Sequence, residues 1–156
     1  MANTEPRPSW DDIWDAIATQ VSFRSLCVQA QVGAVITDSH NHIVSTGYNG
    51  PPAGFNHKNL PCNVWCSRSL YPHIDRMLCP SVHAEANALL SADRSRWKNG
   101  TMFVNKHPCW ECSKLIANSG LTRLVVKPIK TTPAGHHSEQ TYDFLELCGL
   151  TVEVLE

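Results

Sequence analysis

Two short segments constrain the fold of this chain more than any other feature: His83-Ala84-Glu85 and Pro108-Cys109-Trp110-Glu111-Cys112. Together they supply one imidazole, two thiols and, in Glu85, a spare carboxylate. Catalytic zinc typically takes three protein ligands and keeps a fourth position open. His83, Cys109 and Cys112 can fill the three positions, which leaves Glu85 free to move protons. The fold must therefore bring two distant segments to one point.

The spacing within each segment predicts where its residues lie on a helix. Cys109 and Cys112 stand three residues apart and can share one helix face, and Pro108 before them suits a first helical turn. A helix N-terminus also favours thiolate, the form that binds metal. His83 and Glu85 stand two residues apart, so they can reach one point only at a helix tip. The sequence therefore predicts two neighbouring helices whose N-termini meet.

The chemistry that follows is hydrolytic. Bound zinc lowers the pKa of water to about 7, and H-x-E followed by P-C-x-x-C is the signature of zinc nucleobase deaminases. Hydroxide would attack ring carbon C4 while Glu85 shuttles protons to the ring and to the leaving amine. C-x-x-C alone would equally fit a structural zinc site or a redox pair. A structural site needs a fourth ligand, and the motif offers a carboxylate instead, so the catalytic interpretation is favoured.

Composition narrows the class of protein. The 156 residues suit one domain, and a hydrophobic share of 42% supports a packed core. The net charge is −1 without a Lys/Arg run, so no long nucleic-acid footprint is indicated. No apolar run approaches the ~20 residues of a membrane span, and no export signal is recognisable. Seven cysteines then indicate reduced thiols or metal ligands, and we predict a cytoplasmic protein.

Regular structure is expected from Ser9 onward, after a flexible tail at residues 1–8, and residues 9–156 are expected to form one domain. Ser9 and Asp12 can form a capping box. The apolar stripe that follows predicts a helix ending near residues 24–25: Trp10, Ile13, Trp14, Ile17 and Val21. Residues 32–37 and 43–48 read as a strand hairpin.

The second half alternates helices with strands. Helices are expected at residues 82–92, 108–118 and 141–148, with Leu115 and Ile116 facing inward and Gly120 closing the second of them. Strands are expected at residues 101–105, 121–127 and 151–155. This alternation predicts a three-layer α/β/α sandwich around a five-strand mixed sheet, the cytidine-deaminase-like class.

Residues 55–79 show no period and are expected to form an inserted loop. Two interpretations stay open: a lid with scattered thiols, or a second, structural zinc. The candidate ligands of that zinc are Cys62, Cys66, Cys79, His57 and Cys27. Asn49, at the end of the second strand, can aim its amide into the site and hydrogen-bond a sugar hydroxyl.

The order of these motifs resembles the deoxycytidylate deaminase family within the cytidine-deaminase superfamily. The likeness is carried by Val32-Gly-Ala-Val-Ile36, Ser45-Thr-Gly-Tyr-Asn-Gly50 with Pro52-Ala-Gly54, His83-Ala-Glu-Ala-Asn-Ala88, Pro108-Cys-Trp-Glu-Cys112 and Ser119-Gly-Leu121. The resemblance implies conversion of dCMP to dUMP and ammonia. It also implies a homo-hexamer, often regulated by dCTP and dTTP with Mg²⁺.

The resemblance also implies roles for single residues. His83, Cys109 and Cys112 look like the zinc ligands, and Glu85 looks like the proton shuttle. The remaining implied contacts are to substrate: Asn49 to the sugar, and the backbone N–H of Ala84 to the pyrimidine carbonyl.

The chain departs from the family where phosphate is expected to bind. Relatives often carry an arginine at the position of Gln29, and many carry another where this chain has Cys79-Pro-Ser-Val82. Arg24, Lys58, Arg68 or Arg76 could replace them, and of these Arg24 is assigned to the substrate site. The alternatives to dCMP as the substrate are dCTP, a free nucleoside, and a tRNA or polynucleotide base. The alternative to a deaminase is a non-catalytic zinc module.

Overall fold

Five strands form one mixed sheet at the centre of the computed structural model, which describes residues 6–55, 79–127 and 138–155. The strands are β1 (Gly33–Thr37), β2 (Ile43–Tyr48), β3 (Thr101–Val104), β4 (Arg123–Val126) and β5 (Thr151–Val154), in the spatial order β2-β1-β3-β4-β5. β1 runs antiparallel to β2 and β3, whereas β3, β4 and β5 run parallel. The predicted five-strand mixed sheet is confirmed.

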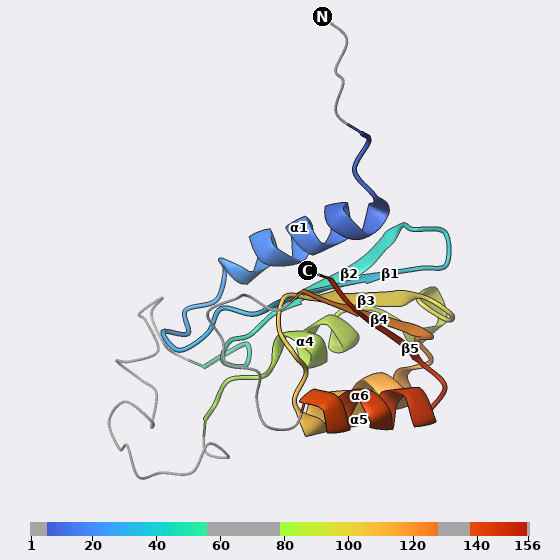
Figure 1. Ribbon diagram of the computed structural model, residues 1–156. Coiled ribbons are helices and arrows are strands. Elements are labelled where there is room, and N and C mark those ends of the chain that lie inside the picture. The colour runs from blue at the N-terminus through green and yellow to red at the C-terminus, as the bar shows by residue number, and fades with distance from the viewer. Residues whose placement is uncertain (1–5, 56–78, 128–137, 156) are drawn as a thin grey trace, which may run out of the picture.

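Helices cover both faces of this sheet, as Figure 1 shows. One face carries α1 (Trp10–Ser22), and the other carries α4 (Ala84–Leu90), α5 (Trp110–Ser119) and α6 (Ser138–Leu147). A short 3-10 helix, η2 (Arg94–Arg96), precedes β3. The three-layer α/β/α prediction is therefore confirmed. Among the described helices, none combines the length and apolar composition needed to cross a bilayer.

The first helix begins as its sequence predicts. Ser9 is the N-cap, its hydroxyl accepts from the N–H of Asp12 at 3.1 Å, and the Asp12 carboxylate accepts from the N–H of Ser9. Its buried side chains pack on the sheet through Trp14 and Ala18. The helix ends at Ser22, short of the predicted residues 24–25, because the next three N–H groups bond carbonyls only three residues back.

Gly47 in β2 allows α4 to approach the sheet closely. A Cβ built at this position would lie 2.2 Å from the carbonyl oxygen of Ala84 and 2.4 Å from the nitrogen of Ala88. The hydroxyl of Ser45 on the same strand donates to the carbonyl of Ala88 at 2.8 Å. The Ser-Thr-Gly segment of β2 therefore fixes α4, the helix that carries the first motif.

The sheet also places the two motif helices at one end of the molecule. β2 and β3 flank β1 and are both antiparallel to it, so their carboxyl ends lie at the same end of the sheet, one on each side of β1. The start of α4 is tied to the end of β2 by two backbone hydrogen bonds between Gly50 and Val82, of 3.1 and 2.8 Å. α5 begins shortly after the carboxyl end of β3.

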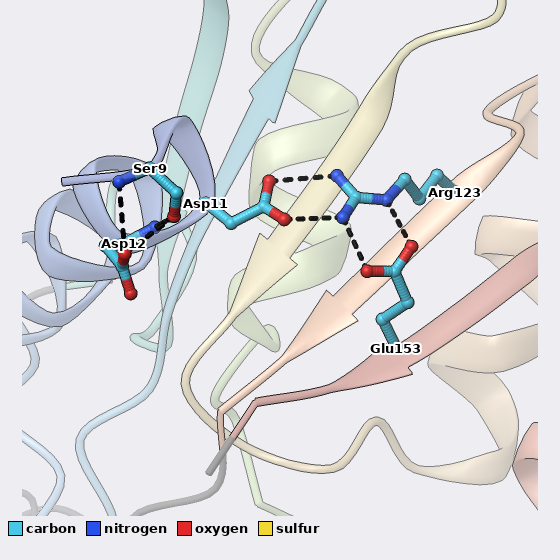
Figure 2. A network of polar contacts seen from close by, with 5 residues as sticks. All are labelled: Ser9, Asp11, Asp12, Arg123 and Glu153. Atoms are coloured by element: carbon cyan, nitrogen blue, oxygen red, sulfur yellow. Dashed lines mark hydrogen bonds and ion pairs between the residues drawn. The ribbon is translucent and has the colours of Figure 1, made fainter. Parts of the chain in front are cut away.

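A second feature joins α1 to the opposite edge of the sheet (Figure 2). The guanidinium of Arg123 on β4 donates two hydrogen bonds to Asp11 in the first turn of α1 and two to Glu153 on β5. The distances range from 2.6 to 2.9 Å. One residue thereby links three elements.

Some predicted details differ from the structure. Leu115 is 48% exposed, so its predicted inward position is wrong, whereas Ile116 is fully buried as predicted. α4 is shorter than residues 82–92, and α6 begins at Ser138 rather than near residue 141. Gly120 closes α5 with a φ of 90°, as expected of a left-handed cap. Residues 6–8 lack regular structure; residues 1–5 and most of the predicted inserted loop lie outside the described ranges.

Candidate metal centre and active site

The two zinc-motif segments meet at helix tips. His83 is the N-cap of α4, and Cys109 is the N-cap of α5, where its sulfur accepts from the N–H of Cys112 at 3.5 Å. Both residues have extended backbone, so their side chains project past the helix ends rather than along them. Cys112 follows in the first turn of α5 and is buried. The predicted meeting of two helix N-termini is confirmed.

The donor atoms lie at distances that suit a zinc ion. Nδ1 of His83 is 3.4 Å from the sulfur of Cys109 and 3.4 Å from that of Cys112, and all three donor atoms lie within 4.8 Å of one another. A zinc tetrahedron with bonds of about 2.3 Å to sulfur and about 2.0 Å to nitrogen has N···S edges of about 3.5 Å. Within the described residues, no other group of three His, Cys, Asp or Glu side chains gathers in this way. The donors therefore fit zinc.

The charges of the site favour metal binding. The hydrogen bond from Cys112, together with one from His83, lowers the pKa of Cys109 to about 4. The same contact with Cys109, with burial, raises the pKa of Cys112. The hydrogen bond to Cys109 also raises the pKa of His83. The lowered pKa of Cys109 favours the thiolate form, which is the form that coordinates metal.

Glu85 lies beside the three donor residues, but it is not one of them. It sits in the first turn of α4 and is only 4% exposed. Burial raises the pKa of its carboxyl, and contacts with His83 and Cys112 act in the opposite direction. A raised pKa makes the carboxyl a better proton acceptor than an ordinary glutamate, which suits a group that has to take up a proton and pass it on.

Asn49 lies at the end of β2, as predicted, but its side-chain amide also hydrogen-bonds to the backbone of the segment that precedes β1. Its Oδ1 accepts from the N–H of Val32 at 2.8 Å, and its Nδ2 donates to the carbonyl of Ala30 at 2.9 Å. An amide oxygen can accept twice and an amide nitrogen can donate twice, so one site on each atom is left for a ligand. Asn49 thus holds the segment that contains Gln29 beside the end of β2.

Two further predicted contacts lie near the same end of the sheet. The N–H of Ala84 belongs to the first residue of α4, where helix geometry leaves it without an intrahelical acceptor. Arg24 follows α1, is exposed, and has its guanidinium carbon 5.8 Å from the ring centroid of Tyr48. Tyr48 immediately precedes Asn49, so Arg24 lies on the strand end that leads to the site.

The described residues test only part of the second-zinc prediction. Cys27 and Cys79 are partly buried, and neither belongs to a group of three potential metal ligands within the described ranges. The other candidates lie outside the described residues: His57, Cys62 and Cys66, as do the proposed phosphate ligands Lys58, Arg68 and Arg76.

Sequence reasoning missed two residues that shape the site. Asn87 on α4 donates through Nδ2 to the carbonyl of Tyr48 at 2.8 Å, which fastens the helix to the end of β2. His107, just before Pro108, hydrogen-bonds through Nδ1 to the hydroxyl of Tyr142 on α6. Only the adjacency of these residues to the two motifs could have drawn attention to them, because their partners are distant in sequence.

The fold and site together define an α/β/α protein in which three donors that fit zinc meet at two helix N-termini. The family model described as the cytidine and deoxycytidylate deaminase zinc-binding region matches residues 8–127. The chain belongs to this family of zinc-dependent hydrolytic deaminases.

Similar proteins carry the deoxycytidylate deaminase name. The chain is 40% identical over 127 residues to the enzyme of Mycobacterium phage D29, a match that spans 76% of this chain and 94% of that one. It is 34% identical over 151 residues to the enzyme of Saccharomyces cerevisiae, a match that spans 94% of this chain but only 45% of the yeast protein. The fold matches the apo crystal structure of dCMP deaminase from cyanophage S-TIM5 with a TM-score of 0.68 and 24% identity, over 96% of this chain and all of that one.

Proposed function

We propose that this protein catalyses the zinc-dependent hydrolysis of dCMP to dUMP and ammonia. The observation that carries the proposal is that one imidazole and two thiols meet within 4.8 Å, beside the buried carboxyl of Glu85, which is not one of the three donors. The names of the phage and yeast relatives support the nucleotide substrate. The cyanophage enzyme has also been crystallised with dCMP and dUMP, and it shares the fold.

Each site residue has a role in this proposal. His83, Cys109 and Cys112 would hold the zinc ion, which when bound lowers the pKa of water to about 7 and so supplies the nucleophile. Glu85 takes the two protons of the attacking water in turn, and delivers the first to ring nitrogen N3 and the second to the amine, which leaves as ammonia while the oxygen becomes the new carbonyl. The raised pKa of its buried carboxyl supports both directions of transfer.

The substrate contacts follow from the same end of the sheet. The N–H of Ala84 binds the pyrimidine carbonyl, and the remaining hydrogen-bonding capacity of Asn49 binds the sugar hydroxyl. Arg24 binds the phosphate in place of the arginine that relatives carry at the position of Gln29. The support for this last role is its position over Tyr48, next to Asn49.

The finer parts of the proposal concern the whole protein. They comprise one deaminase domain over residues 9–156 with an inserted loop at 55–79, a cytoplasmic location and a homo-hexamer. They also include regulation by dCTP and dTTP with Mg²⁺, and a second zinc bound by residues of the loop. Family membership supports these parts, and zinc content per chain together with oligomeric mass in solution would test them.

A substrate panel tests the proposed function. The fall in ultraviolet absorbance that reports deamination should be fastest with dCMP, slower with dCTP, deoxycytidine and cytidine, and absent after the zinc is removed. The Arg24→Gln variant should raise KM for dCMP by about 10-fold, since it loses a charged hydrogen bond, and leave KM for deoxycytidine unchanged. Turnover of the free nucleosides alone would contradict the nucleotide assignment, and turnover of a tRNA base alone would support the polynucleotide alternative instead.

A further inference from the structure

Pro108 and Cys109 form the tip that leads into α5, the Cys109 tip. Helix α6 contacts the residues on both sides of this tip. On the N-terminal side, Nδ1 of His107 hydrogen-bonds to the hydroxyl of Tyr142, with ring centroids 5.7 Å apart. On the C-terminal side, the ring of Trp110 packs against Phe144 at a centroid distance of 4.8 Å and an angle of 48°. The side chains that immediately flank Pro108 and Cys109 are therefore both held by one helix.

The sulfur of Cys109 contacts only His83 and Cys112 among the contacts described above, and both partners belong to the donor group itself. The Cys109 side chain is exposed. The Cys109 carbonyl accepts hydrogen bonds from the N–H and the hydroxyl of Ser113, within the first turn of α5. The loop that precedes it is fixed at its far end by Asn105, whose Oδ1 accepts from the N–H of Gly33 at 2.9 Å. Between Asn105 and α5, the contacts with α6 restrain the backbone that delivers the sulfur.

The anchoring of α6 to the core does not depend on these contacts. Leu145 is fully buried and Thr141 is 1% exposed, so the helix is held against the protein through these two positions. Tyr142 and Phe144 are partly buried and also pack against this core, so the variants that test them keep an apolar side chain at each position. A small change at Tyr142 or Phe144 should therefore leave the helix in place and release only the Cys109 tip.

We propose that Tyr142 and Phe144 are positioning residues that clamp the α5 tip and thereby set the geometry of Cys109 as a metal ligand. The inference rests on the proposed function, because it assigns Cys109 to the zinc site. Outer contacts that orient a ligand commonly change metal affinity or activity by about 10–100-fold when they are removed. The clamp should therefore affect how long the ion stays and how it is coordinated.

The test measures the metal directly in three variants of the full chain. Tyr142→Phe removes one oxygen, Phe144→Leu removes the ring contact, and Leu147→Gln is the control on the same helix, because Leu147 is 87% exposed. Zinc release to an excess of chelator is followed by stopped flow, and the cobalt-substituted proteins are compared by visible absorption. Subtraction of the His83→Ala spectrum isolates this site from any other cobalt.

Tyr142→Phe and Phe144→Leu should each release zinc about 10-fold faster than the wild type and weaken the thiolate-to-cobalt charge-transfer band, while their melting temperatures stay close to that of the control. His107→Asn, which keeps an acceptor for the phenol, should recover most of the wild-type release rate compared with His107→Ala.

Two results would overturn the inference in distinguishable ways. Wild-type release rates and unchanged cobalt bands in both clamp variants would overturn it alone, with the proposed function intact. A wild-type chain that binds neither zinc nor cobalt at His83 and Cys109 would overturn the proposed function, and the clamp with it.

Discussion

The residues that carry the chemistry stand at the ends of elements, where a side chain is least confined by its own helix. His83 and Cys109 are N-caps, positions that usually belong to Ser, Thr, Asp or Asn. His83 makes no side-chain hydrogen bond to its own helix, so α4 gives up this common form of capping. We attribute the absence of a side-chain cap on α4 to metal binding, which needs the imidazole to point away from the helix.

A buried carboxylate outside the site gives a prediction about pH and stability. Asp15 on α1 is 8% exposed, lies 3.6 Å from the ammonium of Lys127, and has a pKa raised by burial. An acid with a raised folded-state pKa is protonated more readily in the folded chain, so its contribution to stability is lost as pH rises above its ordinary value of 3.8. Asp15→Asn should therefore increase the free energy of unfolding at pH 7, and the gain should vanish near pH 3. Urea unfolding across this pH range checks it, and a variant less stable than the wild type at pH 7 would contradict it.

At the scale of elements, β2 and α4 behave as one unit. Gly47, the Ser45 hydroxyl and the Asn87 amide each join the strand to the helix that carries His83 and Glu85. This contact explains why glycine stands in the middle of a strand, where it is otherwise unfavourable. The Ser-Thr-Gly segment therefore has a packing reason that does not involve the substrate.

Gly47→Ala tests the coupling between this packing and the site. The added Cβ would overlap the backbone of α4, which is not a flexible side chain, so the helix has to move. We expect a loss of about 1–3 kcal/mol in the free energy of unfolding, and a loss of zinc affinity because His83 moves with the helix. Calorimetry and zinc titration measure the two effects, and Gly50→Ala is the control, since its Cβ would meet only the Tyr48 ring at 3.6 Å. Equal zinc affinity in Gly47→Ala and the wild type would contradict the coupling.

The Arg123 network gives a second prediction at this scale (Figure 2). Arg123→Met leaves Asp11 and Glu153 without their shared cation, and should lower the free energy of unfolding by about 1–2 kcal/mol at pH 7 and low salt. The hydrogen bond from Arg123 lowers the pKa of Glu153, so this stabilisation is present above about pH 4.5 and is lost as pH falls through the folded-state pKa. Denaturation at pH 7 and at pH 3 checks this, and a loss of equal size at both would be inconsistent with an ionic network.

Across the whole molecule, local patterns predicted the site better than its surroundings. The Ser9 cap and the Cys109–Cys112 pair each depend on residues three positions apart; the cap is confirmed, and the structure brings the two thiols together with His83. The wrong position of Leu115 has a physical cause. Cys112, Ser113, Ile116 and Ser119 are the buried residues of α5, and Leu115 lies outside their face. The start of α6 is polar, so no apolar period indicated it.

Apart from the meeting of the two motif segments, contacts between distant segments could not be predicted from the sequence. The hydrogen bonds between Asn49 and the backbone of Val32 and Ala30, and the hydrogen bond between His107 and Tyr142, join residues 17 to 35 positions apart. Such partners are decided by sheet order and helix placement, which set the distance between segments only after the chain has folded. A pattern search can therefore find the metal donors but not the residues that hold them.

The most direct test of the account compares turnover of dCMP by the wild type and by Glu85→Gln, each loaded with the same amount of zinc. Gln keeps the size of the side chain but cannot carry a proton between the water and the base. We predict unchanged zinc binding and a fall in kcat of about 10²–10⁴-fold. Deamination by Glu85→Gln at close to the wild-type rate would contradict the assignment of Glu85 as the proton carrier, and with it the proposed mechanism.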